Sequence, residues 1–318
     1  MNTLAVIIAA IALVPAPKSI VLSGGESAPN AAIAFSTDAS IPKEGYRIAV
    51  GTGRVDVAYS DSAGRLYAQV TLDQLKTAEV TYPLCRIEDH PSYPWRGMLV
   101  DGASNFIDRD GVEMMIDVMV LHKMNVMHWH LTEDQSWRIP SRLYPELEKY
   151  GRARPCSHRE NSSRWRKVSE WIDDKGDRKF GPFWYSREDI AEIRAYAKAR
   201  NVKIVPEIAV PGHVRAVLAA YPEFGCRTEY LSTNRVARWQ DHGQEYEVLC
   251  IGSDAAVKFV MDELDELCEL FPDSDVIHVG GDEAPVDRWR ECPRCQARMK
   301  AEGLKTEREL QGWLEKKR

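Results

Sequence analysis

The chain has 318 residues, a formal net charge of −6 at pH 7 and 44% hydrophobic residues. The mild negative charge provides no basic surface for nucleic acid, and no apolar segment is long enough to span a bilayer. The cysteine total is seven, an odd number in a large chain, which argues against a dense disulfide framework.

The first residues of the chain are apolar and end in Ala10-Ile11-Ala12. A small-x-small pattern of this kind is typical of a signal peptidase site, which makes residues 1–12 a candidate signal peptide. No Lys or Arg stands near the start, so a buried first strand is an equally simple interpretation. We expect a periplasmic or secreted protein, with a cytoplasmic one as the alternative.

Apolar segments and helical periodicity alternate four times along the rest of the chain. The second helix is expected to begin with Ser186-Arg187-Glu188-Asp189, a capping-box sequence. This alternation predicts a parallel sheet, most simply part of a (β/α) barrel. The expected strands cover residues 98–101, 125–131, 202–208 and 275–280, and the expected helices cover residues 109–124, 187–201 and 254–271.

Polar residues follow or flank each expected strand, and the pair Asp282-Glu283 is the most informative of them. Active sites of α/β proteins lie at the carboxyl ends of parallel strands, which gives these acids a functional interpretation. The alternative is a solvated acidic turn before a helix near Pro285, because acids are favoured in a first helical turn.

Four polar motifs stand in order along the chain: Arg96-Gly97, the run His-Trp-His-Leu-Thr-Glu-Asp-Gln-Ser-Trp-Arg at 128–138, Pro211-Gly212-His213, and His278-Val-Gly-Gly-Asp-Glu283. With these motifs the sequence closely resembles the family 20 glycoside hydrolases, the β-N-acetylhexosaminidases, and the resemblance runs from Val14 to the end of the chain. The resemblance implies a small α/β domain at residues 13–90 and a catalytic (β/α)₈ barrel from residue 91. Val14 to Lys18 looks like the opening strand of the small domain, and residues 64–75 look like its helix.

The resemblance also implies a reaction, the hydrolysis of terminal non-reducing β-linked N-acetylhexosamine. In this family the acetamido oxygen of the sugar attacks C1, and the protein supplies no covalent nucleophile. Adjacent side chains point in different directions, which suits a division of roles. Glu283 is expected to protonate the leaving oxygen, and Asp282 to orient the acetamide and stabilise the developing charge.

Further site residues follow from the same resemblance. Asp134 and His213 are expected to support the acid, and His278 of the acidic motif is counted with them. Arg96 is expected to bind the 3- and 4-hydroxyls of the sugar. The expected partner is an amino-sugar glycan, with no cofactor and no metal.

Two other functions stay open. His128, His130, His213, His278 and Asp282 mimic the ligands of a metal-dependent amidohydrolase barrel. A carbohydrate-binding pseudoenzyme or an inactive fragment of the enzyme is the second alternative. Cys292 and Cys295 could form half of a zinc site, but without a second Cys-x-x-Cys we expect packing at a helix start or a redox-sensitive pair.

The chain departs from the family pattern at several points. Ala209 stands where the family usually has Asp, and Ala103-Ser104-Asn105 stands where an Arg often occurs. Four strand and helix units are half of what a closed barrel of about 250 residues contains. We therefore expect the chain to hold the first half of the barrel.

Overall fold

The computed structural model describes residues 13–155, 170–172, 178–227 and 247–317. The candidate signal peptide at residues 1–12 lies outside them. The chain divides into two compact units. The first contains residues 1–98, 113–127 and 196–203, and the second contains residues 99–112, 128–195 and 204–318.

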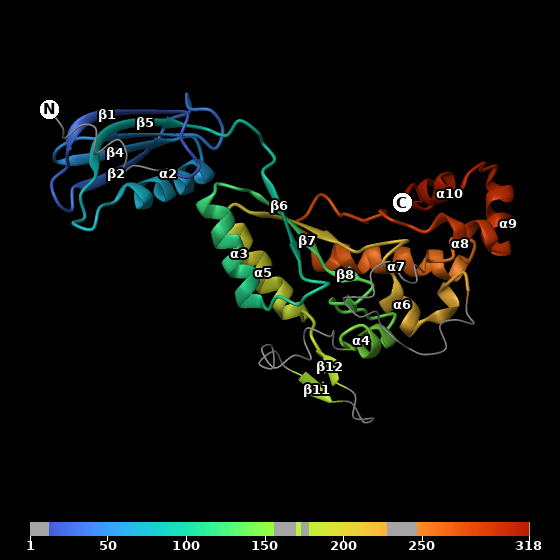
Figure 1. The fold of residues 1–318 in the computed structure, drawn as a ribbon. Helices are drawn as coiled ribbons and strands as arrows, with labels where there is room; N and C mark the ends of the chain where they lie inside the picture. Colours follow the sequence, from blue (N-terminus) through green and yellow to red (C-terminus); the bar gives the residue numbers. More distant parts are fainter. Residues whose placement is uncertain (1–12, 156–169, 173–177, 228–246, 318) are drawn as a thin grey trace. The chain divides into compact units, whose positions relative to one another are not determined.

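The first unit is built on a five-stranded sheet with the order β1-β5-β3-β4-β2. β2 and β4 are parallel, and the other neighbours are antiparallel. Helix α2 (Ser62–Leu75) covers one face of the sheet (Figure 1). The strands are β1 (Ser19–Glu26), β2 (Ala32–Thr37), β3 (Tyr46–Val50), β4 (Arg54–Tyr59) and β5 (Pro83–Asp89).

Alternation of buried and exposed residues along the strands explains why α2 packs on one face of this sheet. Tyr46, Ile48 and Val50 on β3 point to the helix side, as successive side chains of a strand alternate between its faces. Asp61 begins α2 by accepting a hydrogen bond from the backbone nitrogen of Gly64 at 2.9 Å. The expected helix is confirmed, but the opening strand predicted from Val14 to Lys18 is wrong, because the first strand begins at Ser19.

Strands and helices alternate after the first sheet, as the sequence predicts. β6 (Gly97–Asp101), β7 (Val126–His130) and β13 (Lys203–Glu207) form a sheet with the order β13-β7-β6. The intervening helices are α3 (Arg109–Leu121) and α5 (Arg187–Ala199), and Figure 1 shows them side by side.

The capping box predicted for α5 is confirmed. Asp189 donates from its backbone nitrogen to the Ser186 hydroxyl at 3.0 Å, and the Ser186 backbone nitrogen donates to the Asp189 carboxylate at 2.9 Å. Each bond satisfies an amide that the helix itself leaves unpaired.

The fourth predicted strand, at residues 275–280, is wrong as a full strand. Only one parallel bridge forms, between Glu207 and His278. His278 donates to the Pro206 carbonyl oxygen at 3.0 Å, and Val210 donates to the Val279 carbonyl oxygen at 3.0 Å. The segment therefore follows β13 in the parallel direction but is too irregular to count as a strand.

The remaining elements belong to the second unit. Trp129 and Trp137 are 0% and 1% exposed there and belong to its core. Among the described residues, no helix combines the length and apolarity needed to cross a membrane. The elements are β8 (Thr132–Glu133), β9 (Ser136–Trp137), α4 (Glu146–Tyr150), β10 (Arg154–Pro155), β11 (Glu170–Ile172), β12 (Arg178–Phe180), α6 (Arg215–Ala220), the short 3₁₀ helix η1 (Pro222–Phe224), α7 (Asp254–Leu270), α8 (Val286–Glu291), α9 (Pro293–Glu302) and α10 (Glu307–Glu315).

Candidate active site

The carboxyl ends of successive strands lie next to one another in the second unit. Gly102 donates to the His130 carbonyl oxygen at 3.1 Å, and Leu131 donates to the Glu207 carbonyl oxygen at 3.1 Å. Ile208 continues the series by donating to the carbonyl oxygen of His278 at 3.3 Å. The polar residues that end each strand are therefore brought to one rim, as the sequence predicts.

His213 stands between one buried carboxylate and two exposed ones. Its Nδ1 lies 2.7 Å from Oε1 of Glu133, whose side chain is 8% exposed. Its Nε2 lies 3.8 Å from Oδ2 of Asp282 and 3.7 Å from Oε2 of Glu283. These two acids are 73% and 66% exposed, so the series of charged groups opens to solvent at this end.

A close backbone approach makes this arrangement possible. A Cβ atom at Gly212 would lie 3.1 Å from the carbonyl oxygen of Asp282 and 3.3 Å from Cα of Ala284. Only glycine lets the two loops come so near without displacement. The Pro-Gly-His sequence thus carries His213 to the acid pair.

Both functional side chains project from left-handed backbone. His213 has φ 53° and Glu283 has φ 50°. A non-glycine residue in this region is uncommon, and such residues cluster at sites where the surrounding structure fixes a side chain for a purpose. The left-handed backbone at both positions therefore supports a functional role for His213 and Glu283.

The environment of His213 favours its protonated form. The hydrogen bond to Glu133 is the largest effect and outweighs burial, so the pKa of His213 rises to about 9. At neutral pH the ring is an imidazolium. Its Nδ1–H donates to Glu133, and its Nε2–H faces Asp282 and Glu283.

Asp134 lies near His213 but is not its hydrogen-bonded partner. Its carboxylate lies 4.0 Å from Nδ1 of His213 and accepts a hydrogen bond from the backbone nitrogen of Arg215 at 3.1 Å, at the start of α6. Burial and the neighbouring charge of Glu133 raise the pKa of Asp134. Glu133 is therefore the hydrogen-bonded partner of His213, a contact that the sequence did not predict, and the supporting role expected for Asp134 stays a prediction.

Glu133 also extends the series of charged groups inward. Its Oε2 lies 3.7 Å from Nε2 of His130, and Nδ1 of His130 lies 3.5 Å from Oδ1 of Asp101. Burial would raise the pKa of Asp101, but hydrogen bonds from His130 and Ser104 outweigh it and lower the pKa to about 2. Carboxylates and imidazoles thus alternate from Asp101 to the acid pair, a series that we call the relay.

A second cluster joins His128, Glu207 and His278. Nε2 of His128 lies 2.5 Å from Oε2 of Glu207, and Nδ1 of His278 lies 3.1 Å from Oε1 of the same side chain. The two imidazole rings are 4.4 Å apart. His278, predicted to support the acid, therefore contacts Glu207, and through it fixes the segment that precedes the acids.

The five residues of the metal alternative do not converge on one point. His128 and His278 share Glu207, whereas His213 contacts Glu133 and the acid pair, and His130 contacts Asp101. Within the described residues, two groups of three could each offer ligands to an ion, His128 with Glu207 and His278, and Glu133 with Asp134 and His213. Neither group is the predicted set.

The side chain of Arg96 makes four hydrogen bonds within the first unit. Its guanidinium bonds Glu44 at 2.5 Å and the Tyr67 hydroxyl at 3.1 Å. It also donates to the carbonyl oxygens of Lys123 and Tyr93, both at 2.7 Å. The structure thus gives Arg96 protein partners within the first unit, and the sugar-binding role expected for it stays a prediction.

Ala209 lies directly behind the acid loop. It is 2% exposed, and its backbone nitrogen donates to the Thr132 hydroxyl at 2.9 Å. A Cβ atom placed at Gly280 would lie 3.1 Å from its Cα. The residue that replaces the usual Asp of the family thus packs against the segment that carries the acids.

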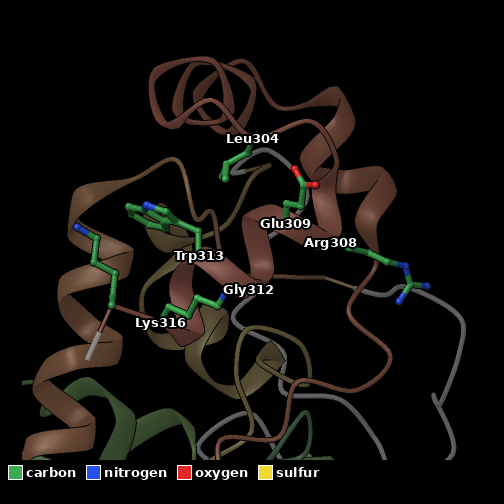
Figure 2. Close-up of a pocket in the computed structure, with 7 residues that line it drawn as sticks. Leu304, Arg308, Glu309, Gly312, Trp313 and Lys316 are labelled. Carbon is green, nitrogen blue, oxygen red and sulfur yellow. The ribbon is translucent and has the colours of Figure 1, made fainter.

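A pocket of about 540 Å³ lies around α10, apart from the residues named above (Figure 2). Arg298 and Lys317 flank the ring of Trp313, with their charged groups 4.8 and 4.6 Å from its centroid. Neither His213 nor the acid pair lines this pocket. Its lining residues are Leu304, Arg308, Glu309, Gly312, Trp313, Lys316 and Lys317.

Two family models match the chain. The model described as "Glycosyl hydrolase family 20, catalytic domain" matches residues 93–318, and the one described as "Glycosyl hydrolase family 20, domain 2" matches residues 17–90. Together they cover most of the described residues, and the first alone covers more than half of the chain.

Curated relatives and solved structures agree with this match. A beta-hexosaminidase of Porphyromonas gingivalis is 34% identical over 311 residues, which are 94% of this chain and 37% of that protein. A beta-hexosaminidase of Akkermansia muciniphila is 34% identical over 85% of this chain and 51% of its own length. The chain thus spans about half or less of these relatives.

A crystal structure of a beta-N-acetylhexosaminidase from Bacteroides fragilis superposes with a TM-score of 0.75 at 30% identity, covering 95% of this chain and 62% of that one. An exo beta-N-acetylglucosaminidase from Vibrio harveyi, in complex with N-acetylglucosamine, gives a TM-score of 0.78 at 25% identity, covering 95% and 52%. These likenesses confirm the predicted fold class. With the catalytic-domain model matching residues 93–318, the chain belongs to glycosyl hydrolase family 20.

Proposed function

We propose that the chain carries the acid and acetamide-orienting groups of a β-N-acetylhexosaminidase, which removes terminal β-linked N-acetylhexosamine from glycans. The position of His213 between Glu133 and the exposed acid pair supports this most directly. Family membership supports the reaction class, in which the acetamido oxygen of the substrate attacks C1.

Asp282 and Glu283 have separate roles in this proposal. Glu283 protonates the glycosidic oxygen as the leaving group departs, and Asp282 holds the acetamide against C1 and stabilises its developing positive charge. Neighbouring residues with divergent side chains can serve two points of one substrate. Their high exposure leaves both carboxylates accessible to a sugar.

His213 supplies the proton that Glu283 needs. In the absence of substrate the proton resides on His213, whose pKa is about 9. A sugar that covers Glu283 removes water from it and favours the neutral carboxyl group. The proton then moves from Nε2 of His213 to Glu283, while Glu133 keeps the ring oriented through Nδ1.

The test compares Glu283→Gln and Asp282→Asn on two substrates, an activated aryl β-N-acetylglucosaminide and one with a poor leaving group. Glu283→Gln should slow the poor leaving group by ~10²–10⁴-fold and the activated one much less, because an activated group departs with little protonation. Asp282→Asn should slow both alike, since cyclisation of the acetamide is impaired for either. Asp287→Asn is a matched control, because that acid lies on α8 and is 76% exposed.

Binding of an oxazoline-mimicking thiazoline tests Asp282 without any turnover. Calorimetry should show a loss of affinity in Asp282→Asn, as the thiazoline resembles the intermediate that this carboxylate stabilises. Equal sensitivity of both substrates to Glu283→Gln, together with unchanged thiazoline binding by Asp282→Asn, would refute the assignment of roles.

Export to the periplasm or the medium remains part of the proposal, and its support is the apolar sequence of residues 1–12. Fractionation of cells that express the chain, with sequencing of the mature amino terminus, tests it. Cleavage after Ala12 is the expected result, and an intact Met1 in the cytoplasm would contradict it.

A further inference from the structure

Four cysteines from three separate segments meet at one point of the second unit. Cys226 follows η1, Cys250 precedes α7, and Cys292 and Cys295 stand at the start of α9. The sulfur of Cys250 lies 3.7 Å from that of Cys292 and 3.7 Å from that of Cys295. The sulfur of Cys226 lies 3.8 Å from that of Cys295, and all four lie within 4.8 Å of one another.

These distances fit a single ion at the centre. A tetrahedral Zn²⁺ with Zn–S bonds of about 2.3 Å holds its sulfurs ~3.8 Å apart. A disulfide needs about 2.0 Å between sulfurs, and the six cysteines that the structure describes are all free thiols. We propose that Cys226, Cys250, Cys292 and Cys295 form a structural tetrathiolate site for one zinc ion.

A helix amino terminus and a guanidinium lie at the four sulfurs. Cys292 is the N-cap of α9, no side chain caps that helix, and Cys295 lies in its first turn. A helix amino terminus favours negative charge. The guanidinium of Arg294 lies against the cluster, interacting with Cys292 and donating to the Gly225 carbonyl oxygen at 2.7 Å. Four thiolates and Zn²⁺ leave two negative charges, which this cation partly offsets.

The backbone is shaped to bring the segments together. A Cβ atom at Gly252 would lie 2.1 Å from the carbonyl carbon of Arg294 and 2.3 Å from the backbone nitrogen of Cys295. The turn that carries Cys250 can approach the start of α9 only because residue 252 is glycine.

The proposed site joins both loops of the candidate active site. Cys292 ends α8, which begins three residues after Glu283, and Trp289 of α8 donates to the Leu249 carbonyl oxygen at 2.9 Å. Leu249, next to Cys250, donates to the Pro211 carbonyl oxygen at 3.0 Å. Figure 1 shows α8, α9 and α10 gathered at one end of the second unit. The metal therefore fixes the acid loop and the His213 loop to the same point.

Metal analysis of the purified chain tests the site without any activity assay. After growth with zinc and dialysis, elemental analysis should find one zinc ion per chain. Titration with a mercurial should release this zinc in step with the reaction of four thiols. Replacement by Co²⁺ should give the visible absorption bands of a tetrahedral cobalt thiolate. Intact mass measurement that finds disulfides among these four cysteines, or a chain that holds no zinc after growth with zinc, overturns the proposal.

Variants separate ligation from packing. Cys226→Ala should lower the zinc affinity by at least about 100-fold. Loss of a residue that only hydrogen-bonds a metal ligand lowers the affinity by about 100-fold at most, so a larger loss indicates direct ligation. Cys226→His should retain zinc, because Cys₃His also binds this ion and residue 226 is only partly buried. Cys268→Ser is the matched control, since that half-buried thiol on α7 lies outside the cluster. Equal zinc content in all three variants would contradict ligation by Cys226.

Removal of zinc with a chelator tests whether the zinc site restrains the loops that carry His213 and the acid pair. Removal of zinc should lower the melting temperature of the chain, because metal binding free energy contributes to folding. It should also raise amide hydrogen exchange at residues 211–213 and 282–286, which the metal fixes through Leu249 and α8. Unchanged exchange in the chelated protein would show that the ion does not restrain these loops.

Discussion

The two units use buried charge in opposite ways. In the first, Arg96 pairs with Glu44, and Lys123 pairs with Asp89 at 2.8 Å while also donating to the Tyr46 hydroxyl. Each charge there is enclosed by its own partners. In the second unit the relay continues outward until it ends on carboxylates that are 73% and 66% exposed. Charges whose partners are all inside the protein can serve only the stability of the fold. The exposed carboxylates at the end of the relay can also act on a molecule that arrives from solvent.

The largest effect is expected at the open end of the relay. His213→Asn removes the imidazolium but keeps a residue that tolerates left-handed backbone. Hydrolysis of a substrate with a poor leaving group should fall by ~10²–10⁴-fold, the usual range for positioned proton transfer. Steady-state kinetics measures the loss. His122→Asn is the control, since that exposed histidine follows α3 with its Nδ1 2.8 Å from the Val118 carbonyl oxygen, away from the acid pair in sequence.

The next effect concerns the closed pair in the first unit. Arg96→Ala leaves Glu44 partly buried and unpaired, so the free energy of unfolding should fall by about 3–5 kcal/mol, as for other broken buried pairs. Arg54→Ala breaks an ion pair whose side chains are 65% and 54% exposed and should cost about 0–1 kcal/mol. Denaturant titration compares the two. A stable Arg96→Ala chain with weakened sugar binding would support the role that the sequence predicted.

The dependence of stability on pH probes the contact between His213 and Glu133. The pKa of His213 is about 9 in the folded chain and about 6.5 when unfolded. The contribution of His213 to the free energy of unfolding is complete below pH ~6.5. It is lost as the pH rises towards ~9, a difference on the order of 3 kcal/mol. Glu133→Gln should flatten this part of the stability profile, because it removes the main cause of the shift.

The smallest effect separates the two neighbouring carboxylates. Asp134→Asn keeps an acceptor for the Arg215 amide, so stability should change by less than about 0.5 kcal/mol. Titration of the His213 ring by NMR should still give a pKa well above the ordinary value for histidine. A drop as large as that in Glu133→Gln would mean that Asp134 is the true partner.

Much of the fold was predictable because its signals are local. Apolar runs, helical periodicity and the Ser186 capping box depend on residues close in sequence, and the structure confirms them. The prediction of a strand at residues 275–280 was wrong because apolar composition does not determine whether the backbone hydrogen bonds of a regular strand can form. Only the bridge at His278 forms there, and the glycines that follow turn the chain away.

The site was predictable as a set of motifs but not as a set of contacts. Glu133 and Asp134 are adjacent acids, and only the hairpin of β8 and β9 decides which of them reaches His213. Arg96 illustrates the same limit, because its partner Glu44 lies 52 residues away in the chain. The four cysteines come from three distant segments, so a search for paired Cys-x-x-Cys motifs misses their convergence.

The left-handed backbone at His213 and Glu283 has a consequence for how the protein evolves. Glycine at either position would relieve steric strain and remove the side chain at the same moment. Selection for thermal robustness alone therefore favours loss of these residues, and selection for turnover must oppose it. Lineages in which the reaction no longer matters should drift towards glycine or asparagine at these two positions first.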